Sequence, residues 1–364
     1  MRALVLSHHY LDPAKRQKLR ELAGLGWTIT LALPGGSTDM DGAIRLAPVP
    51  ATGSIDQPQS LKWSARALRR LLTDIRPDIL HVEEEPESPA AYVAVHEALK
   101  LEIPSVVFSW QSLPRRQSFG ESRRRRRTLA EVCGIIGGNQ MAAHLLSEGA
   151  ADVPALSLPQ HGVTPPPLIE RTPRPTLALA CVGRLVPERG VDQLLHACGQ
   201  LMGPWTLAVA GTGPEQIELE EQAQRLGLAA RIRWMGPISK AQVTALWPEV
   251  DCLVVPSRST PTWTEEYSPV LVDAMSHGVA AVVTAEGALP ELVGDAGIVV
   301  RSDEDLLTAL QQLIVTPRRR TELGQAARLR VLERYSGAAI ARRTAEFWTE
   351  VVSRSRTPRS TVNS

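Results

Sequence analysis

Short apolar segments alternate with longer segments of helical periodicity along almost the whole chain, and this alternation constrains the fold more than any other feature. Short runs rich in β-branched and apolar residues are typical of buried strands, and the residues between them suffice for a covering helix each. The pattern therefore predicts parallel βα units and an α/β protein. We predict strands at 3–7, 28–33, 79–82, 105–109, 134–136, 177–182, 206–210, 232–235, 252–255, 280–283 and 298–300.

Helical periodicity accounts for most segments between these strands. The segment 34–58 is rich in Gly, Pro, Ser and Thr, and we expect it to be irregular apart from a short strand near 44–47. We predict helices at 14–25, 61–75, 89–99, 122–131 and 140–148 in the first half, and at 317–334 and 338–352 at the end of the chain.

A proline-rich break divides the 364 residues, a length sufficient for two domains. Because proline fixes φ and stops a flanking element from continuing, we interpret 163–175 as a stiff linker. It separates two doubly wound, Rossmann-like domains, at 1–162 and 176–335, whose strand ends are expected to face one interdomain cleft. A helix at 336–352 is expected to pack back toward the first domain, and the polar tail 353–364 to be disordered.

Composition excludes some classes of function. Lys and Arg number 40 against 39 Asp and Glu, and this near balance argues against a dedicated nucleic-acid-binding protein. The chain has no run of about 18 apolar residues, and its N-terminal apolar run is too short for a signal peptide, so we predict a cytoplasmic protein. The four cysteines are far apart in apolar surroundings, which favours buried free thiols over metal ligands or disulfides.

A helix start follows the strand at 252–255, and it has the residues expected at an anion-binding helix terminus. Ser268 suits the N-cap, Pro269 suits the first helical position, and Gly278 ends the helix. Because Pro269 has no N–H, the amides of Val270 and Leu271 would bind a diphosphate there. Two acids flank these amides, Glu265 and Asp273, and one could bind sugar hydroxyls while the other binds a ribose; alternatively, Glu265 and Glu266 belong to a solvated loop.

Two arginines, Arg184 and Arg189, follow the strand at 177–182 in a loop that precedes a helix. Guanidinium groups donate bidentate hydrogen bonds and keep their charge, so this pair suits two phosphates, although solvated surface charges are the alternative. The turn Gly211-Thr212-Gly213 lacks the third glycine of a dinucleotide fingerprint, which counts against a dehydrogenase.

These segments together resemble the donor domain of the retaining glycosyltransferases of family 4, which have the GT-B architecture. The resemblance covers roughly 177–300 and is looser in the first half, at 81–86 and 159–163. It rests on the Gly-Arg-Leu loop at 183–185, the Ala-Gly-x-Gly-Pro-Glu turn at 210–215, the acidic pair Glu265 and Asp273 with Ala-Met-x-x-Gly after it, and the run from Gly287 to Gly297.

The resemblance implies a nucleoside diphosphate sugar as the donor and no cofactor. It assigns the diphosphate to Arg184 and Arg189, the donor sugar to Glu265, the ribose to Asp273, and the phosphate-contacting turn to Ser268. Arg189, Asp273 and Ser268 stand where the family usually has lysine, glutamate and glycine. The implied catalytic residues are Arg184, Arg189 and Glu265, and the implied donor-binding residues are Gly183, Met235, Gly236, Pro237, Ser268, Val270, Leu271 and Asp273.

The acceptor is not identified by the sequence, but a set of polar residues at strand ends in the first half is expected to bind it. For Glu84 and Glu85 the alternative is a solvated helix start, and one of His8 and His9 is expected to be buried. Gln111 aligns with a histidine common in the family and cannot carry a proton at neutral pH. The predicted acceptor residues are His8, His9, Lys15, Glu84, Glu85, Gln111 and Asn139.

We expect the barrier to fall chiefly because the arginines and the helix amides stabilise the departing diphosphate. No Asp-x-Asp stands at a strand end, so no metal site is predicted, and the family implies retention of anomeric configuration by same-face attack. The alternatives are a sugar-nucleotide epimerase, a glycogen-type phosphorylase, which the single second-half lysine Lys240 disfavours, and a catalytically idle binding or scaffold protein.

Seven arginines and one glutamate lie between Arg115 and Arg127, a local charge of +6. This patch could contact an anionic membrane from the cytoplasmic side or a phosphorylated acceptor. The alternative is a solvated helix face that balances the acidic run at 83–87.

Overall fold

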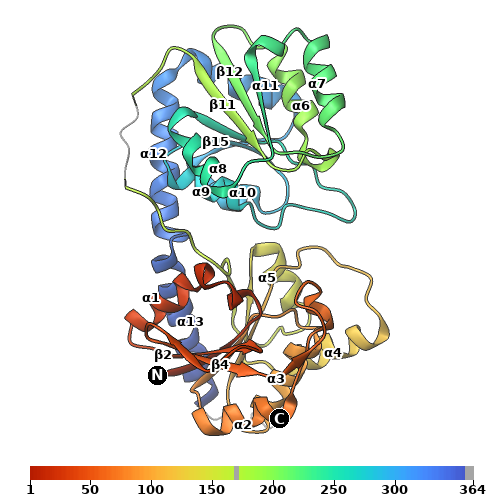
Figure 1. The fold of residues 1–364 in the computed structure, drawn as a ribbon, viewed down its shortest axis with the longest axis vertical. Coiled ribbons are helices and arrows are strands. Elements are labelled where there is room, and N and C mark those ends of the chain that lie inside the picture. The colour runs from red at the N-terminus through yellow and green to blue at the C-terminus, as the bar shows by residue number, and fades with distance from the viewer. Residues whose placement is uncertain (168–171, 357–364) are drawn as a thin grey trace, which may run out of the picture. The chain divides into compact units, whose positions relative to one another are not determined.

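The computed structural model describes residues 1–167 and 172–356, which form two compact units (Figure 1). One unit combines Met1–Gly162 with the described part of the C-terminal segment from Gly337, and the other is Val163–Ser336. The second unit is therefore inserted, in chain order, between two parts of the first.

The first unit is built on an eight-stranded sheet of order β10-β9-β8-β7-β1-β2-β4-β3. All pairings in it are parallel except that of β3 with β4, so crossover helices connect most strands. The strands are β1 (Arg2–Leu6), β2 (Thr28–Pro34), β3 (Asp39–Asp41), β4 (Ile44–Val49), β7 (Ile79–Val82), β8 (Ser105–Ser109), β9 (Gly134–Gly137) and β10 (Ala155–Ser157), beside a separate pair, β5 (Ala51–Thr52) and β6 (Lys62–Trp63).

Helices cover both faces of this sheet, and alternate residues of β1 show it. Ala3 and Val5 pack with one cluster of helical side chains, and Leu4 and Leu6 pack with another. A strand buried on both faces has to be apolar throughout, which explains why β1 was readable from the sequence. The helices are α1 (Gln17–Gly24), α2 (Ala65–Ile75), α3 (Pro89–Leu99), α4 (Phe119–Glu131), α5 (Gln140–Ser147) and α13 (Gly337–Arg356).

Side-chain caps set where several of these helices begin. Ser88 Oγ accepts a hydrogen bond from Ala91 N at 3.0 Å, and the predicted start of α3 is correct. The predicted helix 122–131 begins earlier, at Phe119, because Ser118 and Glu121 form a capping box. The predicted helix 61–75 begins later, at Ala65, because Ser64 caps it and Lys62–Trp63 is a strand.

Two further predictions for the first unit were wrong in extent. The irregular segment 34–58 contains β4, longer than expected, and β3, which is polar because it lies at the sheet edge. The predicted tail 353–364 is helical as far as Arg356, since α13 continues past 352; residues 357–364 lie outside the described residues.

The segment interpreted as a linker is tied to the second unit at its start. Val163 forms a β-bridge with Ser336, and Arg328 donates a hydrogen bond to the carbonyl of Pro166 at 2.6 Å. Positions 168–171 of the predicted linker lie outside the described residues.

The second unit has a six-stranded, wholly parallel sheet of order β13-β12-β11-β14-β15-β16. All six predicted strands are present, within one residue at each end. They are β11 (Leu177–Val182), β12 (Trp205–Ala210), β13 (Ile232–Gly236), β14 (Cys252–Val255), β15 (Ala280–Thr284) and β16 (Ile298–Val300). The helices are α6 (Val191–Cys198), α7 (Gln216–Arg225), α8 (Lys240–Leu246), α9 (Pro269–Ser276), α10 (Leu289–Val293), α11 (Asp303–Val315) and α12 (Pro317–Arg334).

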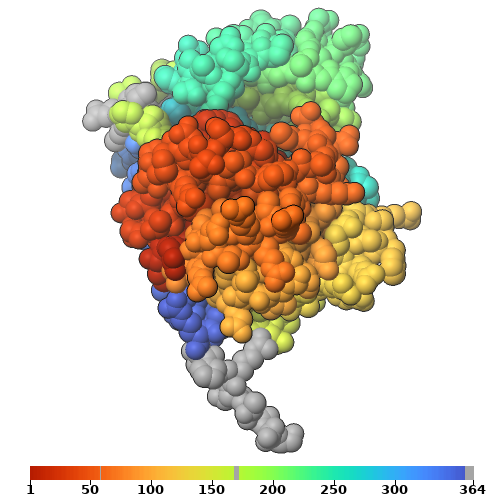
Figure 2. Space-filling view, turned by 60° about the horizontal axis from the view of Figure 1, so that its bottom comes forward, coloured from red at the N-terminus to blue at the C-terminus, as the bar shows by residue number. Residues whose placement is uncertain are grey.

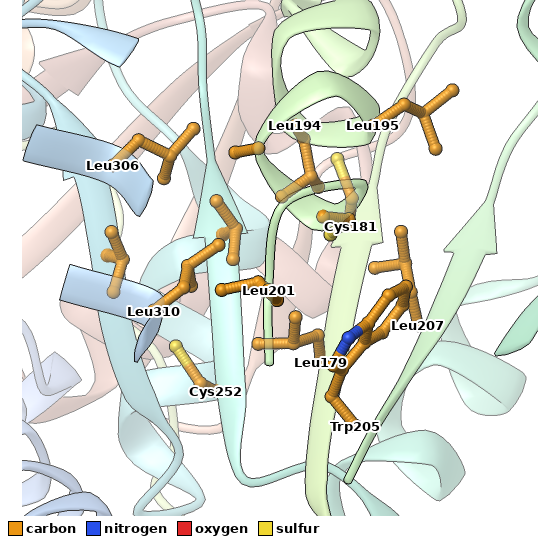
Figure 3. Close-up of a cluster of buried hydrophobic side chains, with 14 of the residues drawn as sticks. Leu179, Cys181, Leu194, Leu195, Leu201, Trp205, Leu207, Cys252, Leu306 and Leu310 are labelled. Atoms are coloured by element: carbon orange, nitrogen blue, oxygen red, sulfur yellow. The ribbon is translucent and has the colours of Figure 1, made fainter. Parts of the chain in front are cut away.

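One face of the second sheet packs against α6 and α11 (Figure 3). Leu179 and Cys181 of β11 lie in this core together with Cys252 of β14. Burial raises the pKa of Cys181 and of Cys252 to about 12, so both thiols are protonated at neutral pH. All four cysteines are free; Cys198 is also buried, as predicted, whereas Cys133 is only half-buried, contrary to the prediction.

The helix α13 packs into the core of the first unit through Trp348, and truncation of this side chain tests the packing. Trp348 is fully buried, with its ring 5.0 Å from that of Trp27 and 5.4 Å from that of His81. Trp348→Ala is expected to destabilise the first unit by about 3–5 kcal/mol because it leaves a large cavity. The urea midpoint, followed by far-UV circular dichroism, measures the loss. The exposed Glu346→Ala on the same helix should leave the midpoint unchanged; equal midpoints for both variants would contradict this account.

Candidate active site

The strand order of the second sheet reverses between β11 and β14. The chain leaves β11 for β12 through α6 and leaves β14 for β15 through α9, and these two helices pack in opposite cores. The loops after the two strands therefore diverge at the carboxyl edge of the sheet. Such a switch point is where doubly wound sheets bind ligands.

An arginine and a glutamate, one from each of these two loops, meet at this point. Arg189 lies in the turn after β11, and its Nη1 forms an ion pair with Oε2 of Glu265 from the loop after β14. Ser257 donates a hydrogen bond to the same carboxylate oxygen at 3.0 Å. The Arg189 guanidinium carbon also lies 5.3 Å from the ring centroid of Trp263.

The surroundings of Glu265 are those of an interior group. Its exposed fraction is 4 %, so the alternative of a solvated loop is wrong for this residue. Burial raises the pKa of the Glu265 carboxyl above its usual value, and the charge of Arg189 opposes this shift.

Arg184 lies in the same loop as Arg189, and the two line one hollow together with Gly183. Its side chain is exposed, and its guanidinium makes no hydrogen bond or ion pair with another of the described residues. The two arginines thus differ: Arg189 is held by protein groups, whereas Arg184 has its donors available.

The glycine turn at 211–213 supports this loop. Gly183 N donates to the Ala210 carbonyl at 2.9 Å, and Leu185 N donates to the Thr212 carbonyl at 3.0 Å. A Cβ on Gly211 would lie 1.8 Å from the Gly183 carbonyl oxygen, so the backbones pack too closely for a side chain. These glycines are explained by backbone packing, a role that the sequence pattern did not indicate.

The helix α9 begins at Pro269, four residues after Glu265, and its first amides precede its first helical hydrogen bond. Ser268 occupies the N-cap position with extended backbone, but its side chain makes no capping hydrogen bond, contrary to prediction. Val272 N donates the helix's first hydrogen bond, to the Ser268 carbonyl at 3.2 Å, so the N–H groups of Val270 and Leu271 lie ahead of the helical ladder.

The remaining predicted donor residues lie on α9 and at the end of β13. Trp247 Nε1 donates to Asp273 Oδ2 at 2.7 Å, which orients the Asp273 carboxylate on α9. Met235 and Gly236 end β13, followed by the exposed Pro237, and the Gly236 carbonyl accepts a hydrogen bond from Gly211 N at 2.8 Å.

The first unit has a switch point of the same kind, between β1 and β7. His8 follows β1 and Glu84 follows β7, and His8 Nδ1 lies 2.8 Å from Glu84 Oε1 while His8 N donates to that oxygen at 2.8 Å. Glu84 is buried, so the alternative of a solvated helix start is wrong for it. A hollow here is lined by His8, His9, Gln59, Glu83, Glu84, Glu85, Ser88, Phe108 and Trp110.

Glu85 reaches the end of the neighbouring strand. Its carboxylate accepts hydrogen bonds from Ser109 Oγ at 2.5 Å and from Trp110 N at 3.1 Å. His9 is neutral at pH 7, because burial and the neighbouring His8 lower its pKa to about 4.

Three other predicted acceptor residues lie outside this lining. Asn139 caps α5 by accepting from Ala142 N at 2.8 Å, and its side chain also exchanges hydrogen bonds with Ser112. Gln111 donates to the Leu113 carbonyl at 2.9 Å, and Lys15 is exposed.

A buried ion pair beneath the hollow was not anticipated from the sequence. Lys18 Nζ binds Glu83 Oε1, and Gln160 Nε2 donates to Glu83 Oε2 at 2.9 Å. The charge of Lys18 holds the pKa of Glu83 at about 2 despite its burial. A lysine within a helical pattern gave no signal that it would point inward, because only the folded chain brings Glu83 beside it.

The arginine-rich segment is partly neutralised from within the first unit. Arg115 and Arg125 form ion pairs with the buried Glu87, and Arg124 Nε donates to the Glu87 carbonyl at 2.7 Å. The exposed members are Arg116, Arg123, Arg126 and Arg127, and Phe119 at the start of α4 is 85 % exposed. Figure 2 shows this segment, coloured gold, on the surface of the first unit.

Residues 1–167 and 172–356 contain neither a candidate metal site nor a helix that could cross a membrane. No group of three or more His, Cys, Asp or Glu side chains there is arranged to hold a metal ion. None of the helices there has both the length and the apolarity needed to cross a membrane.

Both halves of the chain match known glycosyltransferase families. Residues 170–330 match the model of the glycosyl transferases group 1, and residues 14–134 match that of the glycosyl transferase 4-like domain. The chain belongs to the group 1 glycosyltransferases. The resemblance drawn from the loops at 183–185 and 287–297 is therefore confirmed.

Curated relatives of this glycosyltransferase match part of it. The D-inositol 3-phosphate glycosyltransferase of Corynebacterium aurimucosum is 29% identical over 194 residues, which cover 50% of this chain and 45% of the relative. The GDP-mannose-dependent alpha-(1-6)-phosphatidylinositol monomannoside mannosyltransferase of Mycolicibacterium smegmatis is 30% identical over 178 residues, 46% of this chain and 47% of the relative. The matches thus span just under half the length of these relatives.

Solved structures share the fold of this glycosyltransferase over nearly its whole length. HepE of Anabaena in complex with UDP matches with a TM-score of 0.68 at 18% identity, covering 96% of this chain and 100% of that one. Sucrose-phosphate synthase from Thermosynechococcus elongatus matches with a TM-score of 0.68 at 16% identity, covering 97% and 100%. The predicted GT-B fold class, with two doubly wound Rossmann-like domains, is confirmed.

Buried histidines in the first unit predict a pH dependence of stability. Burial lowers the pKa of His81 to about 4 and that of His161 to about 3. Between these values and about 6.5 the unfolded chain binds more protons than the folded one. The contribution of the two histidines to the free energy of unfolding is therefore fully present above pH 6.5, and it is lost as the pH is lowered toward 4.

The urea midpoint should therefore be lower at pH 5 than at pH 7. His81→Phe, which keeps an aromatic ring but cannot bind a proton, should reduce this difference, whereas His196→Gln, at an exposed position of α6, should leave it unchanged. A midpoint that stays constant from pH 7 to pH 5 in the unmodified protein would refute the assignment of neutral buried imidazoles.

Proposed function

We propose that this protein transfers a sugar from a nucleoside diphosphate sugar to an acceptor hydroxyl, with retention of anomeric configuration and without a metal or cofactor. One observation carries the proposal: Arg184, Arg189 and Glu265 come together from two loops at the switch point of the second sheet. Two cations beside a carboxylate suit a donor that joins an anionic diphosphate to a sugar.

The reaction breaks the bond between the anomeric carbon and the diphosphate oxygen, and negative charge accumulates on that oxygen. Arg184 and Arg189 would stabilise this charge by charge-assisted hydrogen bonds, and the Val270 and Leu271 amides at the positive end of α9 would add two donors. The acceptor oxygen forms the new bond on the same face of the sugar, and its proton passes to the departing phosphate oxygen.

The other predicted donor residues would bind the sugar, the ribose and the base. Glu265 would accept hydrogen bonds from hydroxyls of the transferred sugar, since its carboxylate lies beside the arginine that holds the diphosphate. Asp273, oriented by Trp247, would bind the ribose, and the base would lie against Met235, Gly236 and Pro237.

The acceptor would bind in the hollow of the first unit. His8 and Glu84 form a hydrogen-bonded pair there, and Glu85 and His9 add polar groups that can bind hydroxyls. The acceptors named for the two relatives are an inositol phosphate and a phosphatidylinositol mannoside, and both carry several hydroxyls. We propose an acceptor of that polyhydroxylated kind.

Removal of Arg184 tests the donor site. Binding of a ligand to the folded state raises the melting temperature, so UDP, GDP, ADP and dTDP can be compared on the unmodified protein. Arg184→Ala should weaken the nucleotide that binds by about 10–100-fold, since a hydrogen bond to a charged group is worth about 1.5–3 kcal/mol. The matched control is Arg319→Ala, an exposed arginine of α12.

Unchanged nucleotide affinity in Arg184→Ala would refute the diphosphate assignment. Release of the nucleoside diphosphate from a panel of donor sugars distinguishes a transferase from an idle binding protein, which would bind without turnover. Analysis of the donor after incubation distinguishes it from an epimerase, which would change the sugar without an acceptor.

We also propose that the exposed arginines of α4 contact anionic lipid. Phe119 and Arg123 are both exposed, and an apolar ring beside cations suits a membrane interface. Arg123→Gln with Arg126→Gln should lower binding to phosphatidylserine vesicles about 30-fold, from about 1 kcal/mol for each charge. Arg66→Gln with Arg70→Gln on α2 is the control. Equal sedimentation with neutral and anionic vesicles would refute this contact.

A further inference from the structure

We infer that Trp263 and Arg258, both in the loop after β14, are positioning residues that hold Arg189 for the donor diphosphate. The inference rests on the proposed function, because it assumes that Arg189 binds the diphosphate. The sequence did not indicate this role for either residue. The loop after β14 contacts both the backbone of the turn that carries Arg189 and the side chain of Arg189.

Arg258 forms hydrogen bonds with the backbone of the turn η4 (Pro187–Arg189). Its Nη2 and Nε donate to the Pro187 carbonyl at 2.6 and 3.1 Å, and its backbone N donates to the Glu188 carbonyl at 2.8 Å. The same guanidinium binds both carboxylate oxygens of Asp192, at 2.8 and 3.1 Å. Asp192 lies in the first turn of α6, so Arg258 links the loop after β14 to both sides of the turn that carries Arg189.

The backbone contact is close enough to require a glycine. A Cβ at Gly190, the residue after Arg189, would lie 1.9 Å from the Pro256 carbonyl oxygen. Gly190 also has a φ of 63°, in the left-handed region that favours glycine. The turn that carries Arg189 is therefore seated directly on the end of β14.

Trp263 holds the side chain of Arg189. The Arg189 guanidinium carbon lies 5.3 Å from the Trp263 ring centroid, within the range of a cation–π contact. The ring itself is fixed by a tight turn, in which Thr260 N donates to the Trp263 carbonyl at 2.8 Å and Trp263 N donates back at 3.4 Å. Glu265, two residues farther on, binds Nη1 of the same guanidinium.

The Nε donor of this fixed guanidinium is not used by the contacts with Trp263 and Glu265. Nε of Arg189 is buried, and it has no hydrogen-bond partner among the residues that the structure describes. A buried N–H without a partner is costly, and a phosphate oxygen would satisfy it. A free arginine side chain has many rotamers, so a guanidinium already fixed by Trp263 and Glu265 loses less conformational entropy when the phosphate binds.

A double-mutant cycle tests the inference. Dissociation constants for UDP, GDP, ADP and dTDP are measured by calorimetry for the unmodified protein, Trp263→Leu, Arg189→Ala and the double variant. We expect Trp263→Leu to weaken binding by about 3–10-fold in the unmodified background. In the Arg189→Ala background the same change should have no further effect, because the Trp263 ring then has no guanidinium to hold.

Conservative variants separate positioning from folding. Trp263→Phe should restore most of the affinity because it keeps an aromatic face, and Arg258→Lys should lose affinity although it keeps the charge, since lysine lacks the fork that spans Pro187 and Asp192. The melting temperature without nucleotide should be unchanged in Trp263→Leu, because the ring lies at a half-exposed position.

Each failure has its own meaning. Equal losses from Trp263→Leu in both backgrounds would mean that Trp263 contacts the nucleotide sugar itself, and the inference would be wrong while the proposed function stands. No effect of Arg189→Ala, or no binding of any of the four nucleotides, would overturn the proposed donor site and the inference with it.

Discussion

Reversal of strand order is the constraint on which both halves of this molecule depend. Parallel strands can be joined only by crossovers of one hand, so neighbouring strands whose crossovers run to opposite edges must send their helices to opposite faces. In the first unit this happens between β1 and β7, and in the second between β11 and β14. Each reversal leaves two diverging loops. The loops of the second unit carry the Arg189–Glu265 ion pair, and those of the first carry the His8–Glu84 contact.

The strands of the second unit could be predicted nearly to the residue, because a strand covered on both faces is apolar at almost every position. The places of Arg189 and Glu265 followed from the same logic, since both lie in the loops that follow such strands. Their direct ion pair did not follow, because spacing along the chain gives no distance between two loops. For the same reason the sequence could not distinguish a solvated Glu84 from one buried against His8.

Residues with two possible tasks were the hardest to predict. Asn139 follows a strand, as a ligand-binding residue would, but its side-chain Oδ1 caps α5. Lys18 lies in a helix where a surface position is usual, yet it neutralises Glu83 in the interior. Polar edge strands such as β3 leave no periodic signal at all. In each case the partner, rather than the residue type, determines the role, and partners are set by the tertiary fold.

The return of α13 to the first unit also orders events during synthesis. Trp348 and its neighbours on α13 complete a core whose other members lie within the first 162 residues, while all of Val163–Ser336 is translated in between. The second unit is therefore fully synthesised before α13 can complete the core of the first unit. This reverses the usual order, in which N-terminal domains fold first on the ribosome. Until α13 is synthesised, the apolar face of the first sheet that it covers stays exposed, and a chaperone can bind there.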